Sequence, residues 1–129
     1  MEGSALTRFY KDMKGELADY SIRFAIRIVN YYNWLVSEKK EYVMSRQILR
    51  SGTSIGANIH ESNFAAGRKD FRNKLRIAAK EASETEYWLI VLEKTGYFDQ
   101  SFLDLKSMLS SIIKMLTATL KNLGNDDET

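Results

Sequence analysis

The sequence has no cysteine, no proline and a single histidine, His60. Without cysteine the chain has no means of forming a disulfide or a thiolate metal site, a composition compatible with the cytoplasm, where we expect the protein to reside. The absence of proline favours long helices joined by short turns. Uncharged apolar runs stay far below the ~20 residues of a membrane-spanning helix, and the first residues lack a signal-peptide core. We therefore expect a globular protein without membrane contact.

The motifs of common enzyme classes are also missing. A di-iron site in a helical bundle needs two Glu-x-x-His units, and no such unit surrounds His60. The chain has no phosphate-binding loop, no dinucleotide-binding fingerprint and no His-Glu-x-x-His zinc motif. An acidic cluster of Glu81, Glu84 and Glu86 is better explained by a charge network than by a catalytic carboxylate pair. We expect no catalytic residue, no metal and no cofactor.

What the chain does contain is four segments in which apolar residues recur at three- and four-residue steps, the pattern of amphipathic helices. The predicted helices cover about residues 15–37, 45–66, 69–96 and 101–124. Residues 1–14 are expected to form a flexible N-terminal segment, and residues 125–129 a polar tail. Four helices with short connections predict an all-α fold, an antiparallel up-down four-helix bundle over residues 15–124.

Particular residues are expected to mark the helix ends. Ser45 is a candidate N-cap of the second helix, because its hydroxyl can accept a free backbone N–H. Gly67 is a candidate left-handed terminator of the second helix, and Gly96 is expected to end the third. Ser101 followed by Asp104 resembles a capping box at the start of the fourth helix.

Two of the predicted helices are more apolar than a single packed seam requires. The main seams comprise Leu17, Tyr20, Phe24, Ile28, Tyr31 and Leu35 in the first helix and Phe71, Leu75, Ala78, Ala82, Thr85, Leu89 and Leu92 in the third. Second apolar lines run beside them, formed by Ile22, Ile26 and Val29 and by Ile77, Trp88 and Val91. The widened faces favour association with further copies of the chain.

The stretch over residues 50–61 combines a helical apolar period with residues that isolated helices avoid. Gly52 and Gly56 lie four residues apart and remove side chains where a neighbouring helix is expected to approach closely. A polar stripe runs along another face of the same helix, formed by Arg50, Ser54, Asn58 and Glu61. We favour a structural role for this stripe, with internal pairing that fixes the bundle register, over contact with a ligand.

Charge is unevenly distributed along the chain. The net charge is only +2, but residues 41–80 hold eight basic and three acidic side chains, whereas residues 81–129 hold four basic and nine acidic ones. A positive middle and a negative end suit either an anionic partner or pairing between subunits.

Several stretches resemble a known family. The run over residues 49–61 resembles the signature helix of the bacterial 23S ribosomal RNA intervening-sequence proteins. Further similar stretches are residues 41–43, 69–75, 80–89 and 95–97, so the resemblance extends over roughly residues 15–122. It implies a four-helix bundle similar to the accessory variability protein of diversity-generating retroelements. It also implies a ring-like homopentamer, with nucleic acid and a reverse transcriptase as partners of the retroelement relatives.

The first functional hypothesis is a non-enzymatic oligomer that binds RNA or another nucleic acid through a basic patch. The candidate contacts are Arg46, Arg50, Arg68, Lys69, Arg72, Lys74, Arg76 and Lys80. Repetition around a ring would turn a weak patch into a multivalent surface with high avidity. The alternative explanation of the same residues is a solvated helix face whose cations pair with Asp70, Glu81 and Glu84.

The second hypothesis is a scaffold or adaptor whose partner is a protein and that has no affinity for nucleic acid. Aromatic residues often anchor such interfaces, but they also fill the cores of bundles. The candidates are Tyr31, Tyr32, Trp34, Tyr87 and Trp88. For each of them we favour a core or subunit contact.

Overall fold

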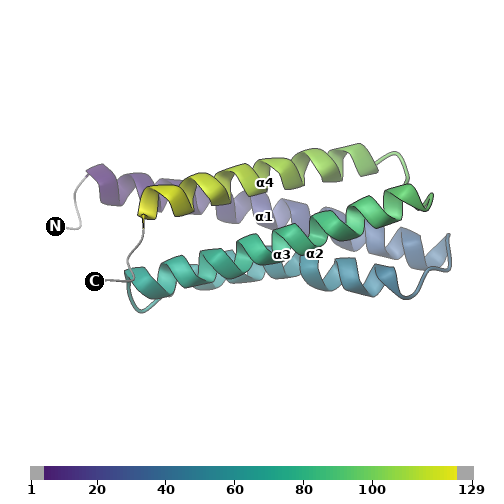
Figure 1. Cartoon of the computed structure of the whole chain (residues 1–129), viewed down its shortest axis with the longest axis horizontal. Coiled ribbons are helices and arrows are strands. Elements are labelled where there is room, and N and C mark those ends of the chain that lie inside the picture. The colour runs from purple at the N-terminus through teal and green to yellow at the C-terminus, as the bar shows by residue number, and fades with distance from the viewer. Residues whose placement is uncertain (1–4, 125–129) are drawn as a thin grey trace.

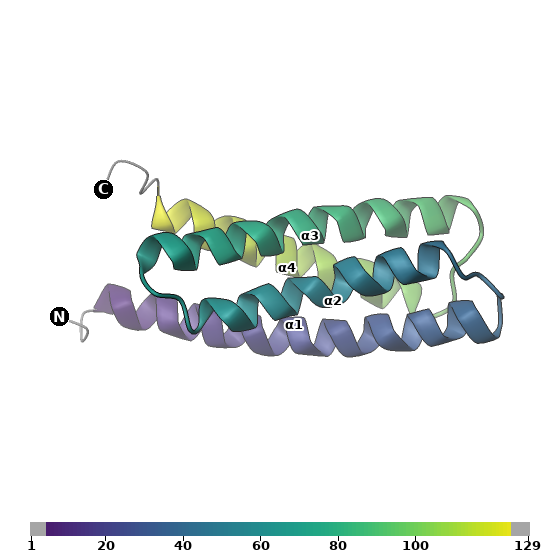
Figure 2. The same cartoon turned by 90° about the horizontal axis from the view of Figure 1, so that it is seen from below.

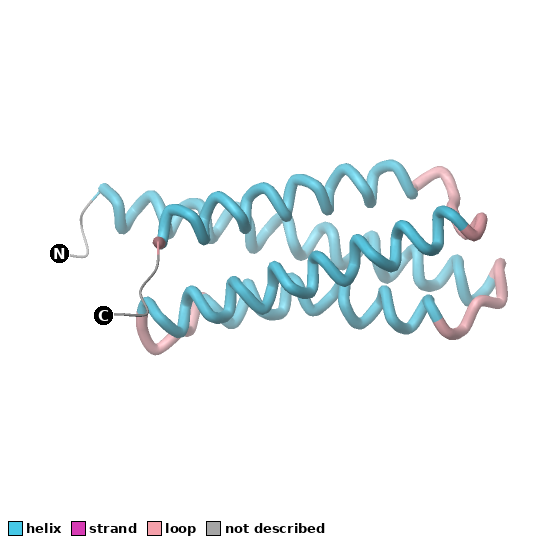
Figure 3. Tube along the Cα trace, viewed as in Figure 1, coloured by secondary structure: helices cyan, strands magenta, loops and turns pink. Residues whose placement is uncertain are grey.

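The computed structural model describes residues 5–124, with side chains described from Gly15 onward, so the predicted polar tail lies outside the described residues. Its helices are α1 (Ala5–Ser37), α2 (Met44–Ser62), α3 (Arg68–Lys94) and α4 (Phe102–Leu123). The helices run side by side in alternating directions (Figures 1 and 2), and the connecting loops lie at the two ends (Figure 3). Consecutive helices contact each other, and α4 also contacts α1. The predicted all-α four-helix architecture is confirmed.

We call the end that carries the α1–α2 and α3–α4 loops the loop end. The opposite end, which carries the α2–α3 loop and the last turn of α4, is called the basic end (Figure 1). None of the helices, within the part of the chain that the structure describes, is long and apolar enough to cross a membrane.

The core follows the predicted main seams. All members of the two seams are buried except Tyr20 and Phe71, which are partly buried. The second apolar lines differ from each other. Ile22, Ile26 and Val29 of α1 remain exposed, whereas the line on α3 is partly buried against the bundle. Of the two second apolar lines, the one on α1 therefore forms an uncovered apolar strip.

Three predicted helix boundaries were wrong. The first helix starts at Ala5 rather than near Gly15, because residues 5–14 contain good helix formers and no proline to stop the helix. The second helix ends at Ser62 rather than near residue 66, where the Ser62 hydroxyl donates to the Ile59 carbonyl at 2.6 Å. Gly67 has an extended backbone and precedes α3 as its N-cap residue, so it is not a left-handed terminator.

The start of α2 is capped by a different residue from the one predicted. The Glu41 carboxylate accepts the backbone N–H groups of Val43 at 3.2 Å, Met44 at 3.1 Å and Ser45 at 2.7 Å. Ser45 therefore lies inside the helix, and its buried hydroxyl has no hydrogen-bond partner among the described residues. A longer acidic side chain reaches the free donors from the loop and leaves the serine no capping role.

Of the other residues predicted to mark helix ends, the glycine was confirmed and the capping box was not. Gly96 and Gly124 have φ angles of 88° and 72°, the left-handed region expected of glycine after a helix. The predicted capping box is wrong, since the Ser101 hydroxyl donates to the Asp99 carboxylate at 2.6 Å. Asp104 instead forms an ion pair with Arg27 of α1 at 2.6 Å.

The two glycines of α2 face α1. A Cβ added at Gly52 would lie 3.0 Å from two carbons of the buried Ile28 side chain, and one added at Gly56 would lie 3.1 Å from the Ser21 hydroxyl. On the side of α2 that faces α3, the buried Thr85 hydroxyl donates to the Ser51 hydroxyl at 2.9 Å. Small residues thus let α2 pack closely between its two neighbours.

Candidate functional site

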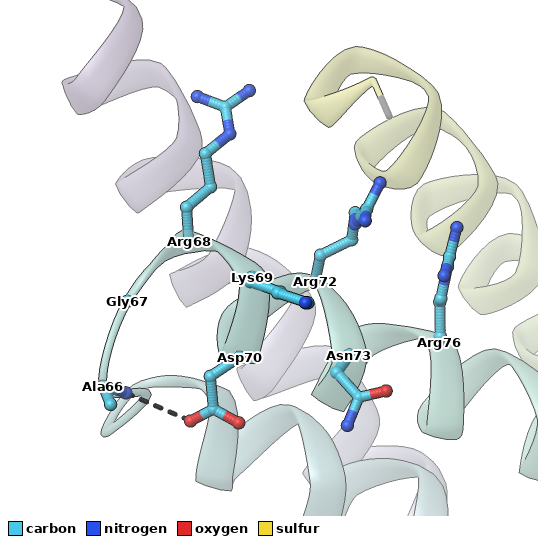
Figure 4. Close-up of a pocket in the computed structure, with 8 residues that line it drawn as sticks. All are labelled: Ala66, Gly67, Arg68, Lys69, Asp70, Arg72, Asn73 and Arg76. Atoms are coloured by element: carbon cyan, nitrogen blue, oxygen red, sulfur yellow. Dashed lines mark hydrogen bonds between the residues drawn. The ribbon is translucent and has the colours of Figure 1, made fainter. Parts of the chain in front are cut away.

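The candidate site lies at the basic end, where the α2–α3 loop meets the first turns of α3 and the last turn of α4. An open depression of about 720 Å³ is found there. Its lining, drawn in Figure 4, consists of Ala66, Gly67, Arg68, Lys69, Asp70, Arg72, Asn73 and Arg76. The depression therefore brings together four of the eight basic residues that were predicted as nucleic-acid contacts.

Arg68 and Arg72 bind the end of α4, and we call them the capping arginines. Arg68 Nη2 donates to the Leu123 carbonyl at 2.8 Å, and Arg72 Nη1 donates to the Gly124 carbonyl at 2.9 Å. These carbonyls belong to the last turn of a helix, where intrahelical partners are missing and cations are favoured. Arg72 is only 2% exposed. The pair therefore joins the start of α3 to the end of α4.

Other cations of α3 face solvent, and we call Lys69, Arg76 and Lys80 the outer cations. All three are exposed, and among the described residues none of them forms an ion pair. Steps of seven and four residues place them within one face of the helix. Figure 4 shows Arg76 beside Arg72, extending in the same direction toward α4. Arg46 of α2 is likewise exposed and unpaired among the described residues, but it lies on another helix.

Among the described residues that line this depression, Asp70 supplies the only carboxylate. It accepts the backbone N–H of Ala66 at 3.1 Å and points away from the arginines, toward the loop (Figure 4). Its position in the first turn of α3 also suits the positive end of the helix dipole. Asp70 is thus engaged by the backbone of the loop rather than by the outer cations.

The remaining two predicted contacts are paired across the α2–α3 interface. Arg50 forms ion pairs with Glu81 at 3.3 Å and with Glu84. Lys74 forms an ion pair with Glu61 at 3.0 Å. The eight predicted cations therefore divide into two that cap α4, two that pair with acids and four that face solvent unpaired within the described chain.

The polar stripe on α2 is connected to α3 at both of its ends. Arg50 and Glu61 supply the ion pairs just described, while the two residues between them bind their own helix. The Ser54 hydroxyl donates to the Arg50 carbonyl at 2.7 Å, and Asn58 Nδ2 donates to the Ser54 carbonyl at 2.9 Å. The stripe lies at a half-exposed rim of the interface, where its polar groups have partners within the chain.

A second surface feature is an apolar groove between α1 and α2. It has a volume of about 410 Å³ and is lined by Ile22, Ala25, Ile26, Val29, Thr53, Gly56, Ala57, His60 and Glu61. Ile26 is 56% exposed. The groove coincides with the uncovered apolar strip of α1, and the small residues Gly56 and Ala57 line it on the α2 side.

The prediction from sequence missed the contribution of α4, because the Leu123 and Gly124 carbonyls carry no signal in the sequence. The burial of Arg72, by contrast, is indicated by its position in the sequence. Arg72 lies three residues before the buried Leu75 and ten before the buried Ala82, which places it toward the core face of α3. Within the described residues, no group of three or more potential ligand side chains is arranged to hold a metal ion.

Comparisons with known proteins identify a family and solved structures similar to this chain. A model of the family described as 23S rRNA-intervening sequence protein matches residues 14–118. A crystal structure of a protein of unknown function from the S23 ribosomal protein family of Bacteroides thetaiotaomicron VPI-5482 is 51% identical in sequence. The match covers 84% of this chain and 98% of that one, with a TM-score of 0.81. No protein among those with curated descriptions matches.

Proposed function

The chain belongs to the 23S rRNA-intervening sequence protein family, and from that premise we propose that it is a non-catalytic, RNA-binding protein that acts as a homo-oligomer. The outer cations bind phosphates of the RNA, while the capping arginines hold the end of α4. The observation that carries this proposal is the row of Lys69, Arg76 and Lys80, exposed on one face and unpaired within the described chain.

The geometry of the outer cations suits a phosphate backbone better than a small anion. From Lys69 to Lys80 the helix rises about 16 Å, which spans several phosphates of a nucleic-acid strand. Side chains of this kind contact phosphates without reading bases, so binding is expected to tolerate sequence and to weaken with salt. Several copies of such a short row in one oligomer would bind a folded RNA with much higher avidity than one copy alone.

The test is fluorescence anisotropy of a labelled, structured fragment of 23S ribosomal RNA at low salt. The double variant Arg76→Gln with Lys80→Gln is expected to bind about tenfold more weakly, because it removes two phosphate contacts. The matched control is Lys39→Gln with Lys94→Gln, which removes the same charge at the loop end and is expected to change affinity less than about twofold. Equal weakening by both pairs would contradict a specific role of the outer cations.

We assign the self-association to the apolar groove between α1 and α2, which would bury the exposed strip of α1 against a second copy. A ring-like pentamer is the assembly that the family resemblance implies. Ile26→Glu places a charge in the groove and is expected to lower the light-scattering mass to that of the 14.9 kDa chain. The matched variant Ile90→Glu changes an equally exposed isoleucine on α3 and should leave the mass unchanged. A monomeric parent protein would contradict the proposal.

A second candidate function is a scaffold for a protein partner, and the loop end favours it. Val43, Phe98 and Leu103 are large apolar residues that lie exposed at or beside the two loops there. The aromatic residues predicted for such a role are mostly engaged elsewhere, since Tyr31 is buried and both tryptophans pack against the core. If the RNA fragment does not bind even at low salt, this candidate takes precedence.

A further inference from the structure

An exposed aromatic residue, Tyr87, lies on the same face of α3 as the outer cations. Tyr87 follows Lys80 by seven residues, and Lys80 follows Arg76 by four, so the three side chains share one face of the helix. Tyr87 is 57% exposed. The exposed tyrosine and phenylalanine residues elsewhere in the described chain lie in loops, namely Tyr42, Phe64 and Phe98. The helix therefore gives Tyr87 a fixed position in line with the cations.

The ring of Tyr87 is supported by the neighbouring Trp88. The two rings meet edge to face, with centroids 5.0 Å apart and planes inclined at 74°. Trp88 is itself held in place, because its indole N–H donates to the Glu84 carboxylate at 3.1 Å and its ring packs against the core. Glu84 also forms the ion pair with Arg50 of α2. These contacts restrain the Tyr87 ring, while more than half of the residue stays exposed.

The charges around Tyr87 leave its ring accessible to an anionic strand. The nearby Glu84 is paired with Arg50. The adjacent Glu86 lies about 100° around the helix, where it lines a groove between α3 and α4 that also contains Lys106. Along the helix axis Tyr87 lies about 10 Å from Lys80, so one strand can reach both side chains. Cations beside an exposed aromatic ring are the combination with which proteins bind single-stranded nucleic acid.

We propose that Tyr87 stacks on an unpaired base of the bound RNA while Arg76 and Lys80 bind phosphates of the same strand. The preferred ligand is therefore an RNA loop or bulge rather than an uninterrupted double helix, whose bases are already stacked and paired. This inference rests on the proposed function, because it uses the same cations. It adds a preference that phosphate contacts do not supply, since paired and unpaired RNA both present phosphates.

The preference is tested by fluorescence anisotropy at low salt with two labelled RNAs of equal nucleotide number. One is a hairpin with a loop of unpaired adenines, and the other is a duplex in which every base is paired. The parent protein is expected to bind the hairpin about tenfold more tightly, the effect of one base stacked on an aromatic ring. Tyr87→Leu keeps an apolar side chain without a π-system and is expected to remove this difference, whereas Tyr87→Phe should retain it.

The matched control is Tyr42→Leu, which changes a tyrosine of similar exposure, 49%, at the loop end and should leave the hairpin preference unchanged. Stacking itself is measured with 2-aminopurine in place of one loop adenine, because this base loses fluorescence when it stacks on an aromatic ring. The expected result is quenching by saturating parent protein and by Tyr42→Leu, but much less by Tyr87→Leu. Quenching that Tyr87→Leu leaves intact would overturn the inference.

The remaining outcomes separate this inference from the proposed function. Equal affinity of the parent protein for both RNAs would overturn the inference, and so would equal weakening of both by Tyr87→Leu. A lower light-scattering mass of Tyr87→Leu with unchanged RNA affinity would also overturn it and would identify a contact between protein chains. In each of these cases the proposed function stands if Arg76→Gln with Lys80→Gln still weakens binding. If neither RNA binds the parent protein, both proposals fail.

Discussion

The side chain that caps the start of α2 at the loop end and those that cap the end of α4 at the basic end carry opposite charges. At the loop end, Glu41 accepts three N–H groups at the start of α2, and Asp99 accepts the N–H and hydroxyl of Ser101. At the basic end, Arg68 and Arg72 donate to the last carbonyls of α4. Both arrangements result from the free donors and acceptors that every helix leaves at its ends.

The ends differ in what remains after these backbone groups are bound. At the loop end, Glu41 and Asp99 both bind backbone groups, whereas at the basic end two of the four cations that line the depression bind carbonyls of α4. Lys69 and Arg76 face solvent beside these capping arginines. A cluster of charged residues can therefore contain two kinds of residue. Those that bind free backbone groups stabilise the fold, and the others face solvent.

The largest effect on stability is expected at the basic end. Arg72→Ala should lower the free energy of unfolding by about 2–3 kcal/mol, because it removes a charged donor from a helix-end carbonyl and the packing of a buried side chain. Arg76→Ala, one turn away, should change it by less than about 0.5 kcal/mol. Urea unfolding followed by circular dichroism measures both. Similar losses of stability in the two variants would contradict the division of these residues into capping arginines and outer cations.

A smaller effect is expected from the corresponding residue at the loop end. Glu41→Ala leaves three backbone N–H groups without their acceptor and should cost about 1–2 kcal/mol, in the range of a lost helix cap. Glu38→Ala is the matched control, since this acid in the same loop is exposed and its side chain forms no hydrogen bond or ion pair with another described residue. Thermal unfolding of the two variants compares them. A control as destabilised as Glu41→Ala would mean that loop charge, rather than capping, stabilises this end.

The smallest effect is expected for the uncharged donor at the loop end. The Tyr31 hydroxyl donates to the Tyr97 carbonyl at 2.5 Å, and burial, followed by Asp99 and Glu41, raises the pKa of this phenol above its usual value. Tyr31→Phe should therefore cost about 1 kcal/mol at neutral pH, the value of one neutral hydrogen bond. The raised pKa also means that the parent protein loses stability at strongly alkaline pH, above the pKa of an unfolded tyrosine, and that Tyr31→Phe does not lose this contribution. Chemical unfolding at pH 7 and pH 10.5 tests both points, and an identical pH dependence of the two chains would contradict the second.

Much of the fold was predictable because burial repeats with the helical period. The seam through Leu75, Ala78 and Ala82 identified the core face of α3, and the lack of proline pointed to long helices. The helix ends were harder to predict, because a helix cap depends on which side chain lies close enough to accept a free backbone N–H. Glu41 reaches the start of α2 from the loop, so the serine that looks like a cap in the sequence is buried instead.

The region of the site could be predicted from the sequence, but the separate roles of its basic residues could not. Eight cations could be found in the sequence, yet their division depends on partners far along the chain. The carbonyl that binds Arg72 is 52 residues away, and the acids that bind Arg50 are 31 and 34 residues away. Only the packed bundle brings these groups together, so charge counting alone treats Arg72 and Arg76 as equivalent.

The most direct measurement is the salt dependence of RNA affinity for the parent protein and for Arg76→Gln with Lys80→Gln. Each phosphate contact contributes about 0.7–0.9 to the slope of log K against log salt concentration. The double variant is therefore expected to have a slope shallower by about 1.4–1.8, with an unchanged free energy of unfolding. An unchanged slope would contradict the assignment of the outer cations to RNA phosphates.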